Sequence, residues 1–327
     1  MNTLTQSLKL RKLVKKAKKE KSEIESFEKV ENSNVKSKSK KPKKHIGLST
    51  SRAISNTIAY IVLIIISIIW LIPFFCIFCE SFRCESTWQV GYIIPKQWGF
   101  DNYINLFTNT NFPRWFLNTF VIALFVSVFQ TLFVLAMSYG LSRLRFKGRK
   151  FMMNAMLILG MFPGFLTLIL LYKLLNSWGM TNENAMWGLI IVYIASSGMG
   201  YYVSKGFFDT ISKSLDEAAR IDGATRLQVF YKVIMPLSKP IIIYTILTAF
   251  MAPWGDFVFA KYLAHATSDG MNVAVGLQNL ISTPNSLSAN YTTFCAGGIV
   301  VALPVTILFM FLQKYYVEGV TGGAVKG

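Results

Sequence analysis

The sequence predicts an all-α polytopic membrane protein with six transmembrane helices and both termini in the cytoplasm. Three observations support this prediction. Apolar residues make up 53% of the 327 positions, and charged residues only 15%. Several apolar runs reach the ~20 residues that a helix needs to cross a bilayer. Lys and Arg also concentrate in alternate connecting segments, as in chains that cross a membrane repeatedly.

The first predicted domain, residues 1–50, is a basic cytoplasmic tail. Residues 1–52 contain 16 Lys/Arg and 5 Asp/Glu, so they hold +11 of the net charge of +18. This composition buries too little apolar surface to fold alone, so we expect disorder. The tail is too long and too charged for a signal peptide. A solvated tail and a basic helix lying on anionic lipid both stay open, but no aromatic platform for nucleic acid accompanies the lysines.

The second predicted domain, residues 51–318, contains the spans, and residues 319–327 form a cytoplasmic C-terminal tail. The six spans are expected at residues 54–78, 115–141, 151–174, 185–204, 240–263 and 291–312. Pro163 should kink the third span and Pro304 the sixth. The glycines that should let the fourth span pack closely against a neighbour are Gly188, Gly198 and Gly200. The loop between the fifth and sixth spans is polar and rich in turn residues.

The positive-inside rule gives the orientation. With the N-terminus inside, the cytoplasmic segments hold 29 Lys/Arg and the external segments 5. If the N-terminal tail is ignored, the ratio is 13 to 5, so the orientation does not depend on the tail. It places a polar segment, residues 205–240 between spans four and five, in the cytoplasm.

This polar segment predicts a helix, a glycine turn and a second helix. Ser214 and Glu217 have the spacing of a capping box, in which the serine caps the helix and the glutamate reaches back to the cap. Gly223 should end the first helix, because glycine tolerates the left-handed conformation that closes a helix. Thr225 should cap the second helix.

The second helix of the polar segment should be amphipathic. Its apolar side chains at helical spacing are Leu227, Phe230, Tyr231 and Ile234. Pro236 and Pro240 should then break this helix and open the fifth span.

The residue identities of the polar segment give further information beyond its helix–turn–helix pattern. It reads Glu217-Ala218-Ala219, then Asp222-Gly223-Ala224, and later Ile234-Met235-Pro236-Leu237. This resembles the EAA loop of ABC importer membrane subunits, and the resemblance implies a type I ABC importer permease fold. It also implies a coupling helix that docks into a cleft of the ATPase subunit. The implied coupling residues are Glu217, Ala218, Ala219, Asp222, Gly223 and Pro236. The alternative is an ordinary amphipathic cytoplasmic loop.

Residues 54–327 look like the shorter membrane subunit of maltose/maltodextrin-type importers. The stretches NTFVIAL at the start of span two, LILGMFPGFLTLILLY in span three and GVTGGAVKG at the end carry this likeness. In that subgroup the glycine-rich tail reaches into the ATPase dimer interface. The residues that match this tail are Gly322, Gly323, Ala324, Val325, Lys326 and Gly327. The first 50 residues depart from the family pattern, which leaves their role open.

Motifs for catalysis are missing from the sequence. There is no G-x-x-x-x-G-K-[ST] phosphate loop and no G-x-S-x-G nucleophile motif. His45 and His265 are too isolated to form a metal site. We interpret the C-x-x-C pair Cys76 and Cys79 as small apolar residues of a membrane helix. The chain is therefore expected to be no enzyme and to bind no cofactor itself, with ATP used by partner subunits.

Candidate pathway residues lie in the third and fifth spans. Asp256 is a carboxylate inside a predicted span, where ionisable groups usually face a bundle interior or a watery path. Trp254 offers a flat apolar face of the kind on which sugars stack. Met161 and Phe162 could line such a path too. The alternatives are that Asp256 bonds a neighbouring helix near the outer interface and that the others are packing residues.

The resemblance implies a membrane subunit of a binding-protein-dependent importer for carbohydrate, such as maltose or maltodextrin, in a prokaryotic cell membrane. Its implied partners are a second permease subunit, two ATPase subunits, an extracytoplasmic sugar-binding protein and the lipid bilayer. One alternative is a permease for another sugar or sugar derivative. A secondary transporter is a further alternative, but it would need buried ion-coupling residues and usually inverted repeats.

Overall fold

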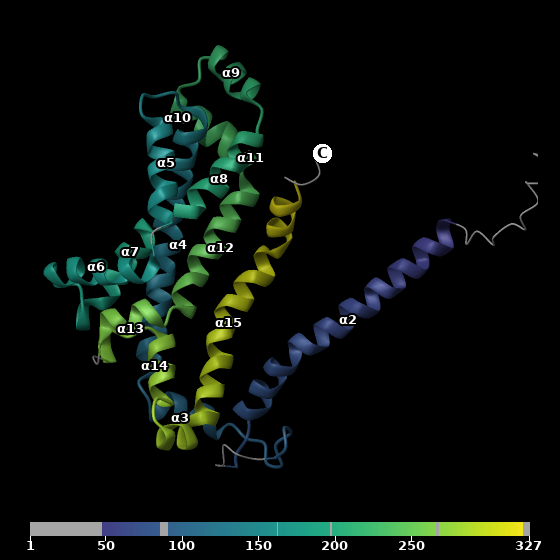
Figure 1. Ribbon diagram of the computed structural model, residues 1–327, viewed down its shortest axis with the longest axis vertical. Helices are drawn as coiled ribbons and strands as arrows, with labels where there is room; N and C mark the ends of the chain where they lie inside the picture. Colours follow the sequence, from purple (N-terminus) through teal and green to yellow (C-terminus); the bar gives the residue numbers. More distant parts are fainter. Residues whose placement is uncertain (1–47, 86–90, 162, 197, 266–267, 323–327) are drawn as a thin grey trace, which may run out of the picture. The chain divides into compact units, whose positions relative to one another are not determined.

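The computed structural model describes residues 48–85, 91–161, 163–196, 198–265 and 268–322 (Figure 1). The chain divides into two compact units, residues 1–69 and 70–327. The described part of the first unit is the N-terminal portion of helix α2 (Leu48–Ser81), and all other elements belong to the second. Within the described residues the structure is helical, and the β-type pairing is a single bridge between Arg83 and Trp98. This confirms the predicted all-α class.

The elements that follow α2 are these: α3 (Asp101–Thr108), α4 (Phe112–Arg143), α5 (Arg149–Gly160), α6 (Gly164–Ser177), η1 (Asn182–Asn184), α7 (Ala185–Ala195), α8 (Gly198–Thr210), α9 (Lys213–Ile221), α10 (Arg226–Gln228), the π-helix η2 (Val229–Ile234), α11 (Met235–Leu237), α12 (Lys239–Gly255), α13 (Val258–Ala264), η3 (Ser268–Gly270), α14 (Val273–Leu280) and α15 (Pro284–Gly322).

Helix α4 is the axis of the second unit. It packs against α12, α8, α7 and α14, while α12 also packs against α15 (Figure 1). The helix starts with a proline in its first turn, where the missing N–H costs no hydrogen bond, and it ends with Arg143, whose charge suits the negative end of the helix dipole. Figure 1 shows α9 beyond one end of α4 and α3 and α14 near the other.

Two apolar clusters fill the second unit. The larger one joins the first half of α4 to α7, α12, α13 and α14, with Ile122, Leu189 and Leu263 fully buried. The smaller one lies near the other end of α4 and contains Leu135, Phe208, Val229, Ile234 and Ile241. The smaller cluster therefore connects the polar segment to the membrane helices.

Among the residues that the structure describes, four helices could cross a membrane by length and composition, and the bent pair of residues 226–237 and 239–255 would make a fifth. The third predicted span instead forms two short helices, α5 and α6, separated at Met161–Pro163. Pro163 is the N-cap residue of α6, because it lacks the N–H that a helix continuing from α5 would need there. The predicted break at Pro163 is confirmed, and the count of six spans stays a prediction.

The predicted end of the fifth span, at residue 263, lies too far along the chain. Helix α12 ends at Gly255, and Asp256 is its extended C-cap residue, so Asp256 does not lie inside a continuous helix as predicted. The loop predicted to follow contains α14 and the start of α15. Asn272 caps α14 by accepting from the Val275 N–H at 3.0 Å, and it donates to the Asp256 carbonyl at 2.7 Å. The local cap and the longer-range bond to Asp256 together make an ordered helix from a stretch whose composition resembles a loop.

Candidate functional site

The polar segment begins with α9, and its cap differs from the prediction. Ser212 is the N-cap, and its Oγ accepts from the Ser214 N–H at 3.3 Å. The predicted capping box between Ser214 and Glu217 is therefore wrong, since Ser214 already lies in the first turn of the helix. Both serines are N-cap residues by type, so spacing alone could not choose between them.

The turn after α9 is a complete Schellman motif. Gly223 has φ +86°, which confirms the predicted left-handed closure. Its N–H donates to the Arg220 carbonyl at 3.1 Å, and the Ala224 N–H donates to the Ala219 carbonyl at 3.0 Å. These are the two bonds that define the motif, so the last carbonyls of α9 are satisfied inside the segment.

A true capping box opens the second helix. Thr225 Oγ1 accepts from the Gln228 N–H at 3.3 Å, and Gln228 Oε1 accepts from the Thr225 N–H at 2.8 Å. The predicted Thr225 cap is confirmed, and Gln228 is the partner that sequence analysis missed. The spacing T-x-x-Q would have identified it.

The second helix widens into the π-helix η2 before Pro236. The Met235 N–H donates to the Phe230 carbonyl, five residues back. Pro236 has no N–H to continue an α-helical ladder, and it lies in the first turn of a new short helix, α11, which begins at Met235. Together with Pro240 at the start of α12, this produces a bend of 82° between residues 226–237 and 239–255.

The π-helix changes which side chains share a face. Phe230 and Ile234 are buried in the smaller apolar cluster, as is Val229. Leu227 and Tyr231, which were predicted on the same face, are exposed instead. A π-helix has more residues per turn than an α-helix, so each residue is rotated less about the helix axis. Phe230 and Ile234 therefore lie on a different face from Leu227 and Tyr231.

The predicted coupling residues divide into an outward and an inward group. Glu217, Ala218, Asp222 and Pro236 are exposed. Ala219 is half-buried against the smaller apolar cluster. The segment also exposes large apolar side chains at both sides of the Gly223 turn: Ile221 is 85% exposed and Leu227 70%.

The candidate pathway residues lie apart from the polar segment. Asp256 accepts a hydrogen bond from the Tyr193 hydroxyl and another from the Phe259 N–H at 3.1 Å. Gln130 of α4 donates to the Tyr193 carbonyl at 2.9 Å, which ties this pair to the central helix. Both members of the Tyr193–Asp256 bond are next to helix breaks, since α7 ends at Ala195 and α12 at Gly255. Sequence analysis missed Tyr193, because a tyrosine in an apolar run carries no visible signal.

The other pathway candidates have different surroundings. Trp254 is 5% exposed and packs edge-on against Phe116 with ring centroids 5.3 Å apart, so packing covers it in this conformation. Met161 is exposed at the end of α5. Phe162 lies outside the described residues, as do Gly323–Gly327 of the predicted tail, and Gly322 is the last residue of α15.

The helical fold, the broken spans and the bent, capped polar segment are those of a membrane transport permease. The chain matches the family model described as "binding-protein-dependent transport system inner membrane component" over residues 132–322. It is 37% identical over 280 residues to the maltodextrin transport system permease protein MdxG of Bacillus subtilis (strain 168), covering 85% of this chain and 99% of that one. It is 36% identical over 284 residues to the galactooligosaccharides transport system permease protein GanQ of the same strain, covering 86% and 99%.

A solved bacterial ABC transporter involved in the import of the acidic polysaccharide alginate has the same fold. The TM-score is 0.68 at 24% identity, over 81% of this chain and 98% of that chain. The chain therefore belongs to the family of binding-protein-dependent transport system inner membrane components. It is a multi-pass membrane permease subunit and not an enzyme, which confirms the resemblance to ABC importer permeases.

Proposed function

We propose that this chain forms half of the translocation pathway of an ATP-driven importer for carbohydrate, and that the polar segment couples it to ATPase subunits. The sequence contains no phosphate loop, so in an ATP-driven importer the ATP would be hydrolysed by partner subunits. The observation that carries the proposal is the exposed apolar pair Ile221 and Leu227 on a segment whose backbone bonds are made internally. Apolar side chains presented on short, rigid helices suit a cleft in a partner protein.

The geometry suggests how movement would be transmitted. The segment is anchored through Val229 and Ile234 in the apolar cluster that also contains Phe208 of α8 and Ile241 of α12. A force on α9 would therefore reach both helices that flank the segment. Because packed clusters move as units, α8 and α12 would tilt together and open the path to alternate sides.

The substrate we propose is an oligosaccharide of the maltodextrin type. The support is the identity to a maltodextrin permease over nearly its whole length. Another sugar is the second candidate, because a galactooligosaccharide permease is almost equally similar. A second permease, two ATPase subunits and an external sugar-binding protein would complete the complex in a prokaryotic cell membrane, with the polar segment inside.

Substitutions on the outward face of the polar segment test the coupling role. Ala218→Arg and Ile221→Arg should each reduce the ATPase recovered with the chain, because a charged side chain replaces an apolar contact. Ile104→Arg is the control: Ile104 is also exposed, at 59%, but lies in α3 near the other end of α4. The measurement is the ratio of ATPase to chain after affinity purification. Equal recovery with the wild-type chain and with all three variants would exclude this face as the ATPase contact.

Uptake tests the substrate. Labelled maltodextrin and galactooligosaccharide should be compared in cells that carry or lack the gene for this chain. We expect maltodextrin uptake to depend on the chain. Uptake of galactooligosaccharide alone would assign the second candidate.

A further inference from the structure

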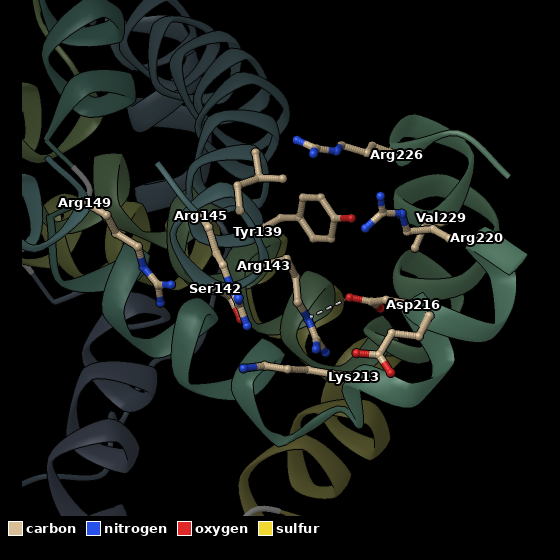
Figure 2. A pocket seen from close by; sticks show the side chains of 12 residues that line it. Tyr139, Ser142, Arg143, Arg145, Arg149, Lys213, Asp216, Arg220, Arg226 and Val229 are labelled. Carbon is tan, nitrogen blue, oxygen red and sulfur yellow. Dashed lines mark ion pairs between the residues drawn. The ribbon is translucent and has the colours of Figure 1, made fainter. Parts of the chain in front are cut away.

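A basic cavity lies between the end of α4, the loop to α5, and α9 with α10 (Figure 2). Its volume is about 390 Å³. Its cationic side chains are Arg143, Arg145, Arg149, Lys213, Arg220 and Arg226, and its carboxylates are Asp216 and Glu217. Six positive groups face two negative ones, so the cavity keeps an excess of four positive charges. A positive excess of this size favours an anionic occupant.

Arg143 contributes buried donors that have no acceptor. Its side chain is 3% exposed. Nη2 donates to the carbonyls of Phe208 at 3.0 Å and Ile211 at 2.7 Å, which fixes the guanidinium in place. Nη1 and Nε are buried and make no hydrogen bond.

Asp216 does not satisfy these donors. Its Oδ2 lies 3.5 Å from Arg143 Nε without forming a hydrogen bond, and its buried Oδ1 has no partner either (Figure 2). Buried polar groups in folded proteins are nearly always paired, and a half-satisfied buried ion pair is unfavourable. A ligand with acceptor oxygens would pair the free Arg143 donors.

We propose that this cavity binds the phosphate group of a phosphate ester. Each of the two free Arg143 donors, Nη1 and Nε, can pair with a phosphate oxygen in a charge-assisted hydrogen bond. Arg145 and Arg149 would neutralise the remaining charge. The volume exceeds that of one phosphate, which leaves space for the group esterified to it.

The phosphate has two possible sources. Helix α4 is long and apolar enough to span the bilayer and ends at Arg143, so an anionic lipid headgroup could reach the cavity. A soluble phosphate ester could enter from the cytoplasm. In either case the ligand would compete with Asp216 for Arg143. If α9 couples to an ATPase, which rests on the function proposed above, the ligand would adjust how α9 is held.

Binding is measured on the full-length chain in nanodiscs, without ATPase, so the result does not depend on the coupling role. The pair Arg145→Gln/Arg149→Gln removes two lining charges. The matched control, Lys147→Gln/Lys150→Gln, removes two charges from the same stretch that do not line the cavity. Arg143→Lys keeps the charge but removes the guanidinium Nη1 and Nε donors. Thermal unfolding identifies any variant that has not folded, and if Arg143→Lys fails, the two pairs still decide.

Two probes distinguish the sources. In nanodiscs of phosphatidylcholine alone, inorganic phosphate is titrated at constant ionic strength and followed by 31P NMR. In nanodiscs containing phosphatidylglycerol, native mass spectrometry counts the retained lipid. For the probe that binds, we expect affinity to fall about tenfold or more in the lining pair and to change little in the control pair. Phosphate binding would identify a soluble source, and phosphatidylglycerol alone a lipid source. Binding of neither probe, or equal loss in both pairs, would overturn the proposal.

Discussion

Gly223 combines a left-handed backbone with empty surroundings. Its φ is +86°, and a Cβ built there would meet nothing within 4 Å. Any effect of a substitution must therefore come from the backbone rather than from a steric clash. The left-handed conformation costs a non-glycine residue roughly 1–2 kcal/mol, and more for a β-branched one.

The first prediction compares two side chains at this position. Gly223→Val should abolish coupled transport while the protein stays in the membrane, because the turn would aim α9 wrongly. Gly223→Asn is the control, since asparagine tolerates the left-handed region and should retain most activity. Sugar-stimulated ATPase activity and sugar uptake are measured in the reconstituted complex. Normal coupling in Gly223→Val would contradict the coupling role of this turn.

Glu85 organises the stretch that follows α2. Its Oε1 accepts from the backbone N–H groups of Lys96 at 2.8 Å and Gln97 at 3.0 Å. Partial desolvation acts to raise the pKa of Glu85, but hydrogen bonds from its own backbone and from Gln97 and Lys96 outweigh it, and the pKa is lowered. A carboxyl whose pKa is lowered in the folded state stabilises the structure at a pH above its pKa in the unfolded state. This stabilisation is lost as the pH falls through its pKa in the folded state.

The second prediction follows from this sign. The protection of the Lys96 and Gln97 amides against hydrogen exchange should be constant near neutral pH and should fall at acidic pH. The measurement is the exchange rate relative to that of an unstructured peptide at each pH. In Glu85→Gln, which cannot titrate, protection should no longer change with pH. An acid-dependent loss that persists in Glu85→Gln would assign it to another group.

At the scale of helices, Gly188 lets α7 pack closely against its neighbours. A Cβ at this position would lie 2.5 Å from the Met180 carbonyl oxygen and 2.9 Å from Leu263 Cδ2. This confirms the close approach predicted for Gly188. Gly206 in α8 is the opposite case, because nothing lies within 4 Å of a Cβ built there.

The third prediction uses this contrast. Gly188→Ala should destabilise the protein by about 1–3 kcal/mol, since a backbone carbonyl cannot move aside cheaply. Gly206→Ala should be neutral or stabilise it by up to about 1 kcal/mol through helix propensity. Thermal unfolding of both variants in the same detergent gives the comparison. Equal effects in the two variants would show that the close approach at Gly188 does not limit stability.

Sequence pattern was sufficient for some elements and not for others. The Gly223 turn, the Thr225 cap and the Pro163 break follow from the backbone chemistry of single residues, so they could be predicted. The end of α12 at Gly255 could not, because it depends on the Asn272 side chain, which donates to the carbonyls of Pro253 and Asp256 from another helix. Such long-range bonds leave no periodic signal in the sequence.

The candidate site shows the same limit. Residues 217–219 and Gly223 could be identified from their order along the chain. The Arg143–Asp216 contact could not, because it joins the end of α4 to α9 across more than 70 positions. In the sequence Arg143 is one of five Lys/Arg within residues 143–150, between the second and third predicted spans, and only the fold separates it from the others.

At the scale of the whole molecule, the family assignment makes the chain a transport permease, and its sequence has no phosphate loop. If the chain is half of the pathway of an ATP-driven importer, as proposed above, its activity depends on partner subunits, which separates an ABC importer from a secondary transporter.

The fourth prediction addresses this dependence. Proteoliposomes that contain only this chain should neither hydrolyse ATP nor accumulate sugar in response to a proton or sodium gradient. Adding the second permease, the ATPase and the binding protein should restore uptake that requires ATP. Sugar accumulation driven by an ion gradient in the chain alone would establish a secondary transporter instead.

The Schellman motif and the capping box meet at consecutive residues, Ala224 and Thr225. Between Ser212 and Gln228 the two short helices thus close their facing ends without help from the membrane helices. A segment with this internal bonding can be transferred between related permeases. Inserted at the same junctions, with the apolar positions beneath Ala219 and Ala224 kept, it should adopt the same conformation. If the polar segment contacts the ATPase as proposed above, exchanging fewer than about 20 residues could change which ATPase a permease pairs with, while its sugar path stayed the same.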